Sequence, residues 1–303
     1  MSALTLGSRV SIWIEAARPK TLWAAVSPVL IGIALAFSNG VEHIPSAILA
    51  LVGAMLIQIG TNFYNDLADF DKGADTDERL GPRRVVHSGL VSRSGMKTAT
   101  MLTFGLAVVS GGYLMVRGGW PIVLIGICSI VFGLLYTGGK YSLAYLGIAD
   151  VFVLIFFGPV AVAGAYFVQS LTWPWPIWVV GIVPGLLAVA ILLVNNIRDR
   201  EQDAAVGKNT LIVRTSRAFG LTMYVGCVAF SAGVVLFLWL VSGFTPWILL
   251  ALLAYPMYRE PIRLLRTVPE SEGHLLNAAL AMTARNLLIV SVLFAVGIIL
   301  GRL

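Results

Sequence analysis

A cluster of acidic and amide side chains within residues 61–75 is the first part of the chain whose composition suggests chemistry. Asn62, Asn65, Asp66 and Asp69 stand at relative positions 0, 3, 4 and 7. If the apolar run before them continues as a helix to about residue 70, this spacing places all four side chains on one helical face. Carboxylate and amide oxygens grouped in this way are ligands that suit Mg²⁺, which commonly also binds phosphate oxygens of a substrate.

A second cluster repeats this pattern further along the chain. Asn195, Asp199 and Asp203 stand at relative positions 0, 4 and 8, and predict one face at the end of another helix. Two such faces opposite each other could hold a diphosphate through Mg²⁺, whereas bare carboxylates would repel that anion. The pattern occurs twice, and Asn62 and Asn195 lie in apolar runs where a polar group is costly. We therefore favour a metal–diphosphate site over acids solvated in loops.

Basic residues lie close to both clusters in the sequence. Arg79 and Arg84 follow the first cluster, Lys208 follows the second, and Lys140 is the single basic residue between 137 and 146. Positive groups beside such a site could bind diphosphate oxygens and stabilise the charge of a leaving pyrophosphate. These four residues are therefore candidate substrate ligands, with Lys140 in a catalytic role.

The composition identifies the environment in which these clusters must work. Of the 303 residues, 58% are apolar and only 12% are charged, and the mean hydropathy is +0.88. A soluble domain has about half apolar and a quarter charged residues, so a soluble enzyme, a disordered chain and a secreted disulfide scaffold are excluded. Cys128 and Cys227 lie in apolar runs and are predicted to be unpaired core residues. The net charge of +6 is explained by membrane orientation rather than by nucleic-acid binding.

Apolar runs of membrane-spanning length predict an all-α, polytopic membrane protein that forms a single domain over residues 1–303. A short amphipathic segment, residues 8–17, precedes the first run and is expected to lie at the membrane surface. The predicted transmembrane helices are nine, and they comprise residues 21–38, 46–65, 98–116, 119–136, 147–169, 177–197, 219–241, 245–258 and 284–301.

The distribution of Lys and Arg predicts the orientation of these helices. Nineteen of the 21 basic residues lie in the N-terminal segment and in alternate connections, and only Arg117 and Arg302 lie on the opposite side. Basic residues collect on the cytoplasmic side of a membrane protein. This predicts a cytoplasmic N-terminus, a C-terminus outside the cell, and both acidic clusters on the cytoplasmic side.

The two clusters also match the motifs of a known family. Asn65-Asp66-Leu67-Ala68-Asp69 has the pattern N-D-x-x-D, and Asp199-Arg200-Glu201-Gln202-Asp203 has the pattern D-x-x-x-D. On these residues the chain resembles the UbiA superfamily of intramembrane aromatic prenyltransferases. Within it, the chain looks most like the members that prenylate 1,4-dihydroxy-2-naphthoate in menaquinone synthesis. Asp150 departs from the expected pattern, in which Glu stands at this position. Further matching strings are Arg18-Pro19-Lys20-Thr21-Leu22, Arg79-x-Gly81-Pro82-x-Arg84, Tyr136-Thr137-Gly138-Gly139, Phe157-Gly158-Pro159-Val160, Asn195-Asn196-Ile197-Arg198-Asp199, Gly207-Lys208-x-Thr210-Leu211 and Thr283-Ala284-Arg285.

The resemblance implies a bundle of nine helices around a central cavity, with an active site at its cytoplasmic side in the cell membrane. It also implies a reaction in which a polyprenyl diphosphate ionises, the allylic cation attacks the naphthoate ring, and the ring carboxylate leaves as CO₂. Mg²⁺ would be held by Asp66, Asp69, Asp199 and Asp203. Asp75 and Asp150 could bind metal, orient a basic residue or accept a proton. The other implied substrate-binding residues are Asn62, Asn65, Arg79, Arg84, Tyr136, Asn195, Asn196, Arg198 and Lys208.

Other functions are compatible with parts of this pattern. A related enzyme could use 4-hydroxybenzoate, homogentisate or a haem as the acceptor, with the same metal motifs. A secondary transporter or metal channel could use the acids as an ion path. Transport sites typically lie near the middle of the bilayer, whereas these acids lie at helix ends beside basic residues that would repel a cation. The sequence therefore favours the enzyme, with a polyprenyl diphosphate, an aromatic acid and the lipid bilayer as its partners.

Overall fold

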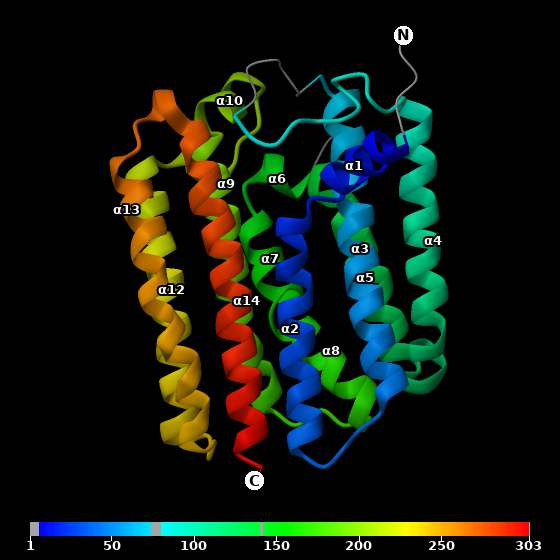
Figure 1. Ribbon diagram of the computed structural model, residues 1–303, viewed down its shortest axis with the longest axis vertical. Coiled ribbons are helices and arrows are strands. Elements are labelled where there is room, and N and C mark those ends of the chain that lie inside the picture. The colour runs from blue at the N-terminus through cyan, green and yellow to red at the C-terminus, as the bar shows by residue number, and fades with distance from the viewer. Residues whose placement is uncertain (1–5, 74–79, 140–141, 303) are drawn as a thin grey trace.

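The computed structural model describes residues 6–73, 80–139 and 142–302, and every regular element in these ranges is a helix (Figure 1). The predicted all-α class is therefore confirmed. The long helices run side by side, and short helices join them at the upper end of Figure 1. In chain order the elements are α1 (Leu6–Ala17), α2 (Pro19–Ser38), α3 (Ile44–Asp71), α4 (Arg93–Gly118), α5 (Trp120–Thr137), α6 (Leu143–Leu146), α7 (Ala149–Phe156), α8 (Pro159–Ser170), α9 (Pro176–Arg198), α10 (Arg200–Ala205), α11 (Leu211–Arg214), α12 (Arg217–Val241), η1 (Pro246–Tyr258), α13 (Arg259–Thr267), η2 (Glu270–Leu275) and α14 (Leu276–Leu300).

Eight helical segments of the described chain are long and apolar enough to cross a membrane. They correspond to eight of the nine predicted runs, so the chain is a polytopic membrane protein. These segments are α2, α3, α4, α5, α7 with α8, α9, α12, and η2 with α14.

The remaining predicted run, 245–258, has a different local structure. It forms the 3₁₀ helix η1, whose 13 residues are fewer than the roughly 20 that an α-helical span needs. Pro256 lies inside it and has no N–H group to donate to an α-helical hydrogen bond. The ninth crossing therefore stays a prediction.

The predicted single run 147–169 is interrupted in the structure. α7 ends at Phe156, and α8 begins at Pro159, where a missing N–H is tolerated in the first turn. A Cβ atom on Gly158 would lie only 2.4 Å from Leu154 O and 2.6 Å from Gly181 O. The break therefore packs closely against α9, which only a glycine at position 158 permits.

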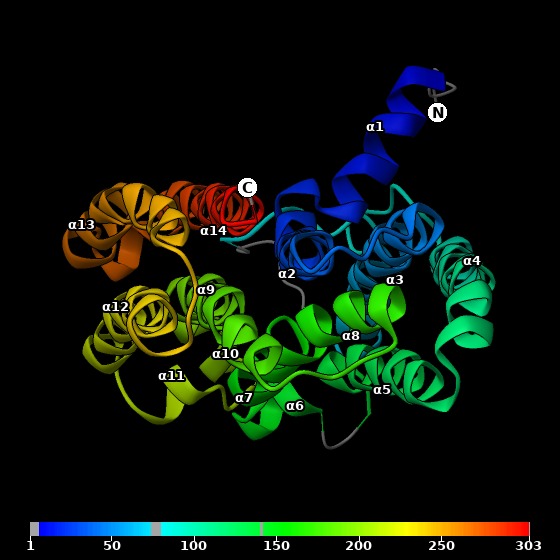
Figure 2. The same ribbon diagram turned by 90° about the horizontal axis from the view of Figure 1, so that it is seen from below.

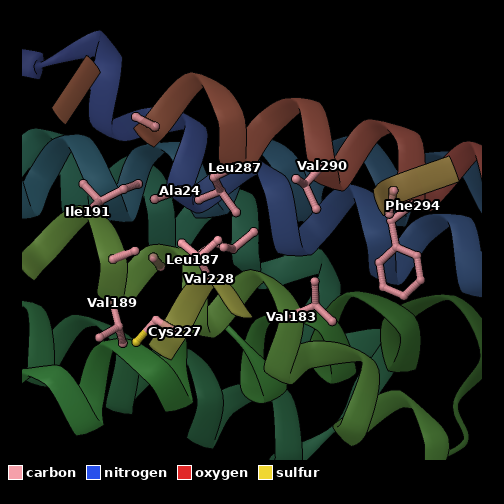
Figure 3. Close-up of a cluster of buried hydrophobic side chains, with 14 of the residues drawn as sticks. Ala24, Val183, Leu187, Val189, Ile191, Cys227, Val228, Leu287, Val290 and Phe294 are labelled. Atoms are coloured by element: carbon pink, nitrogen blue, oxygen red, sulfur yellow. The ribbon is translucent and has the colours of Figure 1, made fainter. Parts of the chain in front are cut away.

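A large apolar core joins α2, α9, α12, η1 and α14. Figure 3 shows Ala24 of α2 near Leu187 and Ile191 of α9, with Cys227 of α12 and Leu287 of α14 in the same cluster. Cys227 is buried and, like Cys128, is not in a disulfide, as predicted. α9 lies among these helices, and its side chains are the most completely enclosed of the eight spans.

The two ends of the bundle differ. α1 lies across the upper end of Figure 1, and Figure 2 shows it extending beyond the bundle. Its Ile12 and Ala16 pack against Phe63 and Leu67 of α3, while Val10 and Ile14 are exposed, as expected for a surface-lying amphipathic helix. α14 ends at the opposite, lower end of the bundle (Figure 1).

Candidate active site

The first acidic cluster lies at the upper end of α3 (Figure 1). The helix continues to Asp71, as the spacing predicts, and Asn62, Asn65, Asp66 and Asp69 are all buried. Buried polar and charged groups are costly unless they have partners. The partners of these four side chains therefore define how the site is built.

The two aspartates hold the segment that follows the cluster. The backbone N–H groups of Val85 and Val86 donate hydrogen bonds to Asp66 Oδ2 and Oδ1, at 3.1 and 3.2 Å. Arg84 forms a buried ion pair with Asp69. The chain after α3 therefore folds back over the cluster, and the predicted diphosphate ligand Arg84 lies directly beside Asp69.

Asn62 holds the joint between α1 and α2. Its Nδ2 donates hydrogen bonds to Ala17 O at 2.8 Å and to Thr21 Oγ1 at 3.0 Å. Between these two residues Arg18 has a φ of 51°, a left-handed conformation that is uncommon for a residue other than glycine. The joint thus keeps Arg18 in a strained conformation next to the cluster, as is frequent at functional sites.

The end of α5 is tied to the same cluster. Thr137 Oγ1 donates to Asn65 Oδ1 at 2.8 Å, and Lys72 Nζ donates to the Thr137 carbonyl oxygen at 2.5 Å. The Lys72 ammonium also lies 4.1 Å from the centre of the Tyr145 ring. Burial lowers the pKa of Lys72, while the negative charge of Asp69 opposes this shift.

The second cluster lies where two helices meet. α9 ends at Arg198, α10 begins at Arg200, and Asp199 between them has φ −94° and ψ 9°. The Asp199 N–H still donates to Asn195 O at 2.9 Å and the Asp203 N–H to Asp199 O at 2.7 Å, so the three residues follow one another turn by turn across a local bend at Asp199. The joint is fixed because the Arg198 guanidinium binds both oxygens of Asp199, at 2.7 and 2.6 Å.

Asp203 is the acid of this cluster with the least complete set of partners. Lys208 Nζ lies 3.1 Å from Asp203 Oδ1, whereas Oδ2 is buried and has no hydrogen-bond partner in the described part of the chain. Burial raises the pKa of Asp203 to about 6; the Lys208 charge opposes this shift, and the charges of Asp199 and Asp69 reinforce it. The charge of Asp69 acts on Asp203, so the two clusters lie near each other.

A short polar chain connects the two clusters to the last helix. Arg198 Nη1 donates to Asn277 Oδ1 at 2.7 Å, and Asn277 Nδ2 donates to the Leu80 carbonyl oxygen at 2.8 Å. The Leu80 N–H donates to Gln202 Oε1 at 3.4 Å. Asn277 on α14 therefore joins the segment after the first cluster to the end of α9.

A cavity of about 370 Å³ lies inside the bundle directly below the clusters. Its polar end is lined by Arg18, Asn62, Asn65, Tyr136 and Asn195, and the rest of its wall is mainly apolar and is formed by α2, α3, α4, α5, α7, α8 and α9. The structure thus places a polar end, with Arg18 as its charged residue, on an apolar cavity, whereas the aspartates of the two clusters are not among the lining residues.

Three further predicted residues differ in how they relate to this cavity. Tyr136 on α5 lines its polar end. Asp150 is buried in the first turn of α7, and its Oδ1 has no hydrogen-bond partner among the described residues. Asn196 is buried on α9 but does not line the cavity.

The carboxylate and amide oxygens of the two clusters are suitable ligands for a hard cation, although they do not form one compact group. Within the described ranges, no three Asp, Glu, His or Cys side chains lie close enough together to hold a metal ion. Mg²⁺ usually takes only one or two carboxylates and completes its octahedron with water and substrate phosphates. The buried, unpartnered Asp203 Oδ2 and the oxygen-only character of both clusters are compatible with such an ion.

The model of the UbiA prenyltransferase family matches residues 25–282. The chain belongs to the UbiA prenyltransferase family. The family predicted from the two motifs is therefore confirmed.

Curated relatives in this family extend over nearly the whole chain. The chain is 34% identical to the 1,4-dihydroxy-2-naphthoate octaprenyltransferase of Escherichia coli (strain K12), over 97% of each protein. It is 36% identical to the enzyme of the same name from Mycobacterium tuberculosis (strain ATCC 25618 / H37Rv), over 81% of this chain and 82% of the relative.

Solved structures show the same fold. A UbiA homolog from Archaeoglobus fulgidus bound to GPP and Mg²⁺ has a TM-score of 0.64 at 14% identity, over 93% of this chain and 99% of the other. The apo structure of a UbiA homolog from Aeropyrum pernix K1 also has a TM-score of 0.64, at 15% identity, over 92% and 98% of the two chains. The chain therefore has the UbiA fold.

Some predicted site residues cannot be placed. Asp75, Arg79 and Lys140 lie outside the described residues. Their predicted roles rest on the sequence alone.

Other residues at the UbiA-type site were not predicted as part of it. Arg18 lines the cavity, Lys72 lies beside the end of α5, and Asn277 connects the clusters. Arg18 precedes a proline that begins a helix, and a residue before proline is disfavoured in the helical conformation, so this signal could have identified the joint. Asn277 carries no such signal, since its partners are distant in the sequence.

Proposed function

We infer that the protein transfers a polyprenyl group from a polyprenyl diphosphate to 1,4-dihydroxy-2-naphthoate, with loss of diphosphate and CO₂. The observation that carries this inference is the apolar cavity inside the membrane bundle, whose polar end is lined by Asn65 and Asn195, next to the aspartates of the two motifs on α3 and at the end of α9. A donor with an anionic head and a long apolar tail matches that arrangement. Near-full-length relatives named for this reaction support the choice of acceptor.

The two clusters are proposed to bind the diphosphate through Mg²⁺. Asp66, Asp69, Asp199 and Asp203 would hold the ion or ions, and bound Mg²⁺ would neutralise charge on the leaving diphosphate. The UbiA homolog from Archaeoglobus fulgidus was solved with GPP and Mg²⁺, which supports this assignment. The polyprenyl diphosphate and Mg²⁺ are thus proposed to occupy the space between α3 and α9.

Basic residues of the site are proposed to bind diphosphate oxygens directly. Arg84, Arg198 and Lys208 each pair with an aspartate of the clusters, so their charges lie where an anion would be held. Charge-assisted hydrogen bonds of this kind are stronger than neutral ones. Arg79 and the catalytic candidate Lys140 are assigned the same role from sequence, and Arg18 adds a positive charge at the polar end of the cavity.

The apolar cavity is proposed to shield the allylic cation from water. Phe132, Phe152 and Phe156 line it, and the Phe132 ring centre lies 4.7 and 5.0 Å from the other two. Aromatic faces attract cations, so this group could stabilise the positive charge as the ring of the acceptor approaches. Tyr136 and Asn195 at the polar end would orient the acceptor, and Asp150 could accept a proton with its unpartnered oxygen.

The membrane topology is also proposed. η1 contains 13 residues, and a rise of about 2.0 Å per residue gives roughly 26 Å, close to the thickness of a hydrocarbon core of ~30 Å. It would form the ninth span, with the charged helix α13 and the N-terminus on the cytoplasmic side and the C-terminus outside.

Cysteine labelling tests this topology. In a background with Cys128→Ser and Cys227→Ser, a cysteine at Ser170 should react with an impermeant maleimide only from the outer side of sealed vesicles. A cysteine at Ser88 should react only from the cytoplasmic side. Labelling of the Ser170→Cys variant from the cytoplasmic side would contradict the topology.

The reaction is tested with purified protein in detergent. The enzyme is offered a polyprenyl diphosphate with dihydroxynaphthoate, 4-hydroxybenzoate or homogentisate, and the product is identified by mass. We expect a decarboxylated product from dihydroxynaphthoate alone, with release of pyrophosphate and CO₂. Excess chelator should abolish turnover and added Mg²⁺ should restore it. A product from another acid, or full turnover in chelator, would refute the corresponding part of the proposal.

A further inference from the structure

An exposed arginine lies within the last membrane span. Arg285 belongs to α14 and stands nine positions after Leu276, the first residue of that helix. Its side chain is exposed, whereas its neighbours Ala284 and Asn286 are buried. A charged side chain on the outer face of a span is costly unless it meets water or an anion. The surroundings of Arg285 therefore decide what this residue is for.

A hydrogen bond fixes the level of Arg285 in the bundle. Asn286 Nδ2 donates to the Met257 carbonyl oxygen at 3.0 Å, so this turn of α14 lies beside the end of η1. η1 ends at Tyr258, and α13 begins at Arg259, which is also exposed. Arg285 and Arg259 therefore lie at nearly the same level, where the apolar helix η1 is followed by the charged helix α13.

The helix α13 adds positive charge beyond this level. Arg259, Arg263 and Arg266 stand at relative positions 0, 4 and 7, which places them on one helical face, and all three are exposed. Leu265 on the other face is buried in the apolar core. Arg263 forms an ion pair with Glu260 of the same helix. The exposed face of α13 is therefore basic, and part of its charge is not neutralised within the helix.

Three of these arginines have no acidic partner in the described part of the chain. They are Arg259, Arg266 and Arg285, which we call the arginine patch. Arg285 donates one hydrogen bond, to Asn286 Oδ1 at 3.4 Å, and this neutral amide leaves its charge uncompensated. Figure 2 shows α13 beside α14 at the edge of the bundle opposite α4. Basic sites between helices on the cytoplasmic side of a membrane protein bind anionic lipid head groups.

The surface of α14 next to Arg285 suits the acyl chains of such a lipid. Val292 and Val296 stand 7 and 11 positions after Arg285, so the three side chains share one helical face. The two valines are 42% and 41% exposed. At about 1.5 Å per residue this strip is roughly 16 Å long, close to half of a hydrocarbon core of ~30 Å. The strip therefore has the length of a lipid chain within one leaflet.

We propose that α13 and α14 bind an anionic phospholipid, whose head group is held by the arginine patch and whose acyl chains lie along Val292 and Val296. This goes beyond the transfer reaction, because neither the acidic clusters nor the cavity takes part. The proposed topology places the lipid in the cytoplasmic leaflet. A head group that contacts Arg259 and Arg285 together joins the end of η1 to α14.

Lipid binding to the full chain in detergent tests this site. Phosphatidylglycerol is anionic, and phosphatidylcholine with the same acyl chains has no net charge. Each is titrated into the purified protein, and bound lipid is counted by native mass spectrometry. We expect phosphatidylglycerol to bind at least about tenfold more tightly, because several arginines lie near its head group. Equal affinities for the two lipids would overturn the proposal.

Single variants locate the site. Arg285→Gln and Arg259→Gln should each weaken phosphatidylglycerol binding about fivefold, the effect of one arginine near an anionic lipid. Lys97→Gln is the matched control, since Lys97 is an exposed basic residue of α4 near the same end of the bundle (Figure 1). It should leave binding unchanged. An equal loss in Lys97→Gln would show only a general attraction between lipid and a basic surface, and would overturn the site.

Two further measurements distinguish a lipid from a soluble anion. Inorganic phosphate at constant ionic strength should not displace phosphatidylglycerol, because it has no acyl chains. Val292→Asn should weaken phosphatidylglycerol binding about threefold, because the chains lose apolar contact. Displacement by phosphate would assign the patch to a soluble anion and overturn the lipid.

Stability and activity are controlled separately. Without added lipid, each variant should melt within about 2 °C of wild type, since the substituted side chains are exposed. A binding loss that only accompanies unfolding would contradict a lipid site at these residues. None of the readouts needs turnover, so failure of the proposed transfer reaction would leave them unchanged.

Discussion

The helices α3, α4 and α5 beside the cavity and the helices of the apolar core differ in how much of each span is buried within the protein. In α9, 78% of the most apolar part of the span is buried within the protein, against 17% in α4 and 11% in both α3 and α5. The core helices touch one another on most sides, as Leu187, Leu287 and Phe294 illustrate in Figure 3. The weakly buried helices α3, α4 and α5 line the cavity on one side and face lipid on the other.

This difference indicates where the chain can change without loss of the fold. Between transmembrane helices the stabilisation comes from close packing, since lipid is as apolar as the side chains. The helices of the apolar core depend on that packing, whereas the helices around the cavity must leave space for a substrate. The acidic clusters lie where the two halves meet, because α3 belongs to one and α9 to both.

The largest expected effect is a loss of activity without a loss of stability, in a variant of the second acidic cluster. Asp203→Asn should lower kcat at least about 100-fold, the scale of losing one preorganised charge-stabilising group. The fold should survive, because a buried carboxylate with an unpartnered oxygen is replaced by a neutral amide of the same size. Turnover and thermal stability in detergent are measured on the same preparation. Glu272→Gln, at an exposed residue, is the control; near wild-type turnover in Asp203→Asn would remove Asp203 from the site.

The next effect sharpens the contrast between core and lipid-facing side chains. Leu287 is fully buried in the apolar core, and Leu287→Ala should lower the free energy of unfolding by about 3 kcal/mol through the cavity it leaves. Leu124 on α5 is 52% exposed, so Leu124→Ala should have little effect. Unfolding of both variants in detergent gives the comparison, and equal losses would contradict the two-part description.

The smallest effect concerns glycines in the two halves. A Cβ atom on Gly181 would lie 2.4 Å from Pro159 Cα, so Gly181→Ala should cost about 2 kcal/mol through overpacking. Gly112→Ala on α4 meets no atom within 4 Å and should be neutral or slightly stabilising, because alanine favours the helix. The melting temperatures of the two variants should therefore move in different directions or by clearly different amounts. A Gly181→Ala variant as stable as wild type would show that the α7–α8 break does not need its close contact with α9.

Much of the architecture could be predicted because a membrane imposes simple rules. Apolar length identified eight spans, and the spacing of Asn62 and Asp69 correctly extended α3 beyond the apolar run. The break at Gly158-Pro159 and the 3₁₀ form of η1 were missed, since hydropathy is the same for straight and interrupted helices. Periodicity also does not reveal the local bend at Asp199, where α9 gives way to α10.

The site itself was only partly accessible from the sequence. The motifs identify which acidic residues lie close together, but not which of them form a buried ion pair. Asp69 pairs with Arg84 inside the protein, so its removal would leave a buried guanidinium and weaken the fold as well as the site. Asp203 pairs with Lys208, which is partly exposed, so its removal leaves no fully buried charge. Contacts of this kind join segments far apart in the chain, and local spacing contains no information about them.

The hydrogen bond between Asn277 and Leu80 has a consequence for how the enzyme is made. Its two residues are 197 positions apart, and α14 is the last long helix to leave the ribosome. Through Arg198, the same asparagine also holds the end of α9. A nascent chain that has inserted every span before α14 therefore still lacks Asn277, which links the segment after the first cluster to the end of α9. Premature termination or incomplete insertion would therefore remove both of these hydrogen bonds from the end of the bundle that carries the acidic clusters.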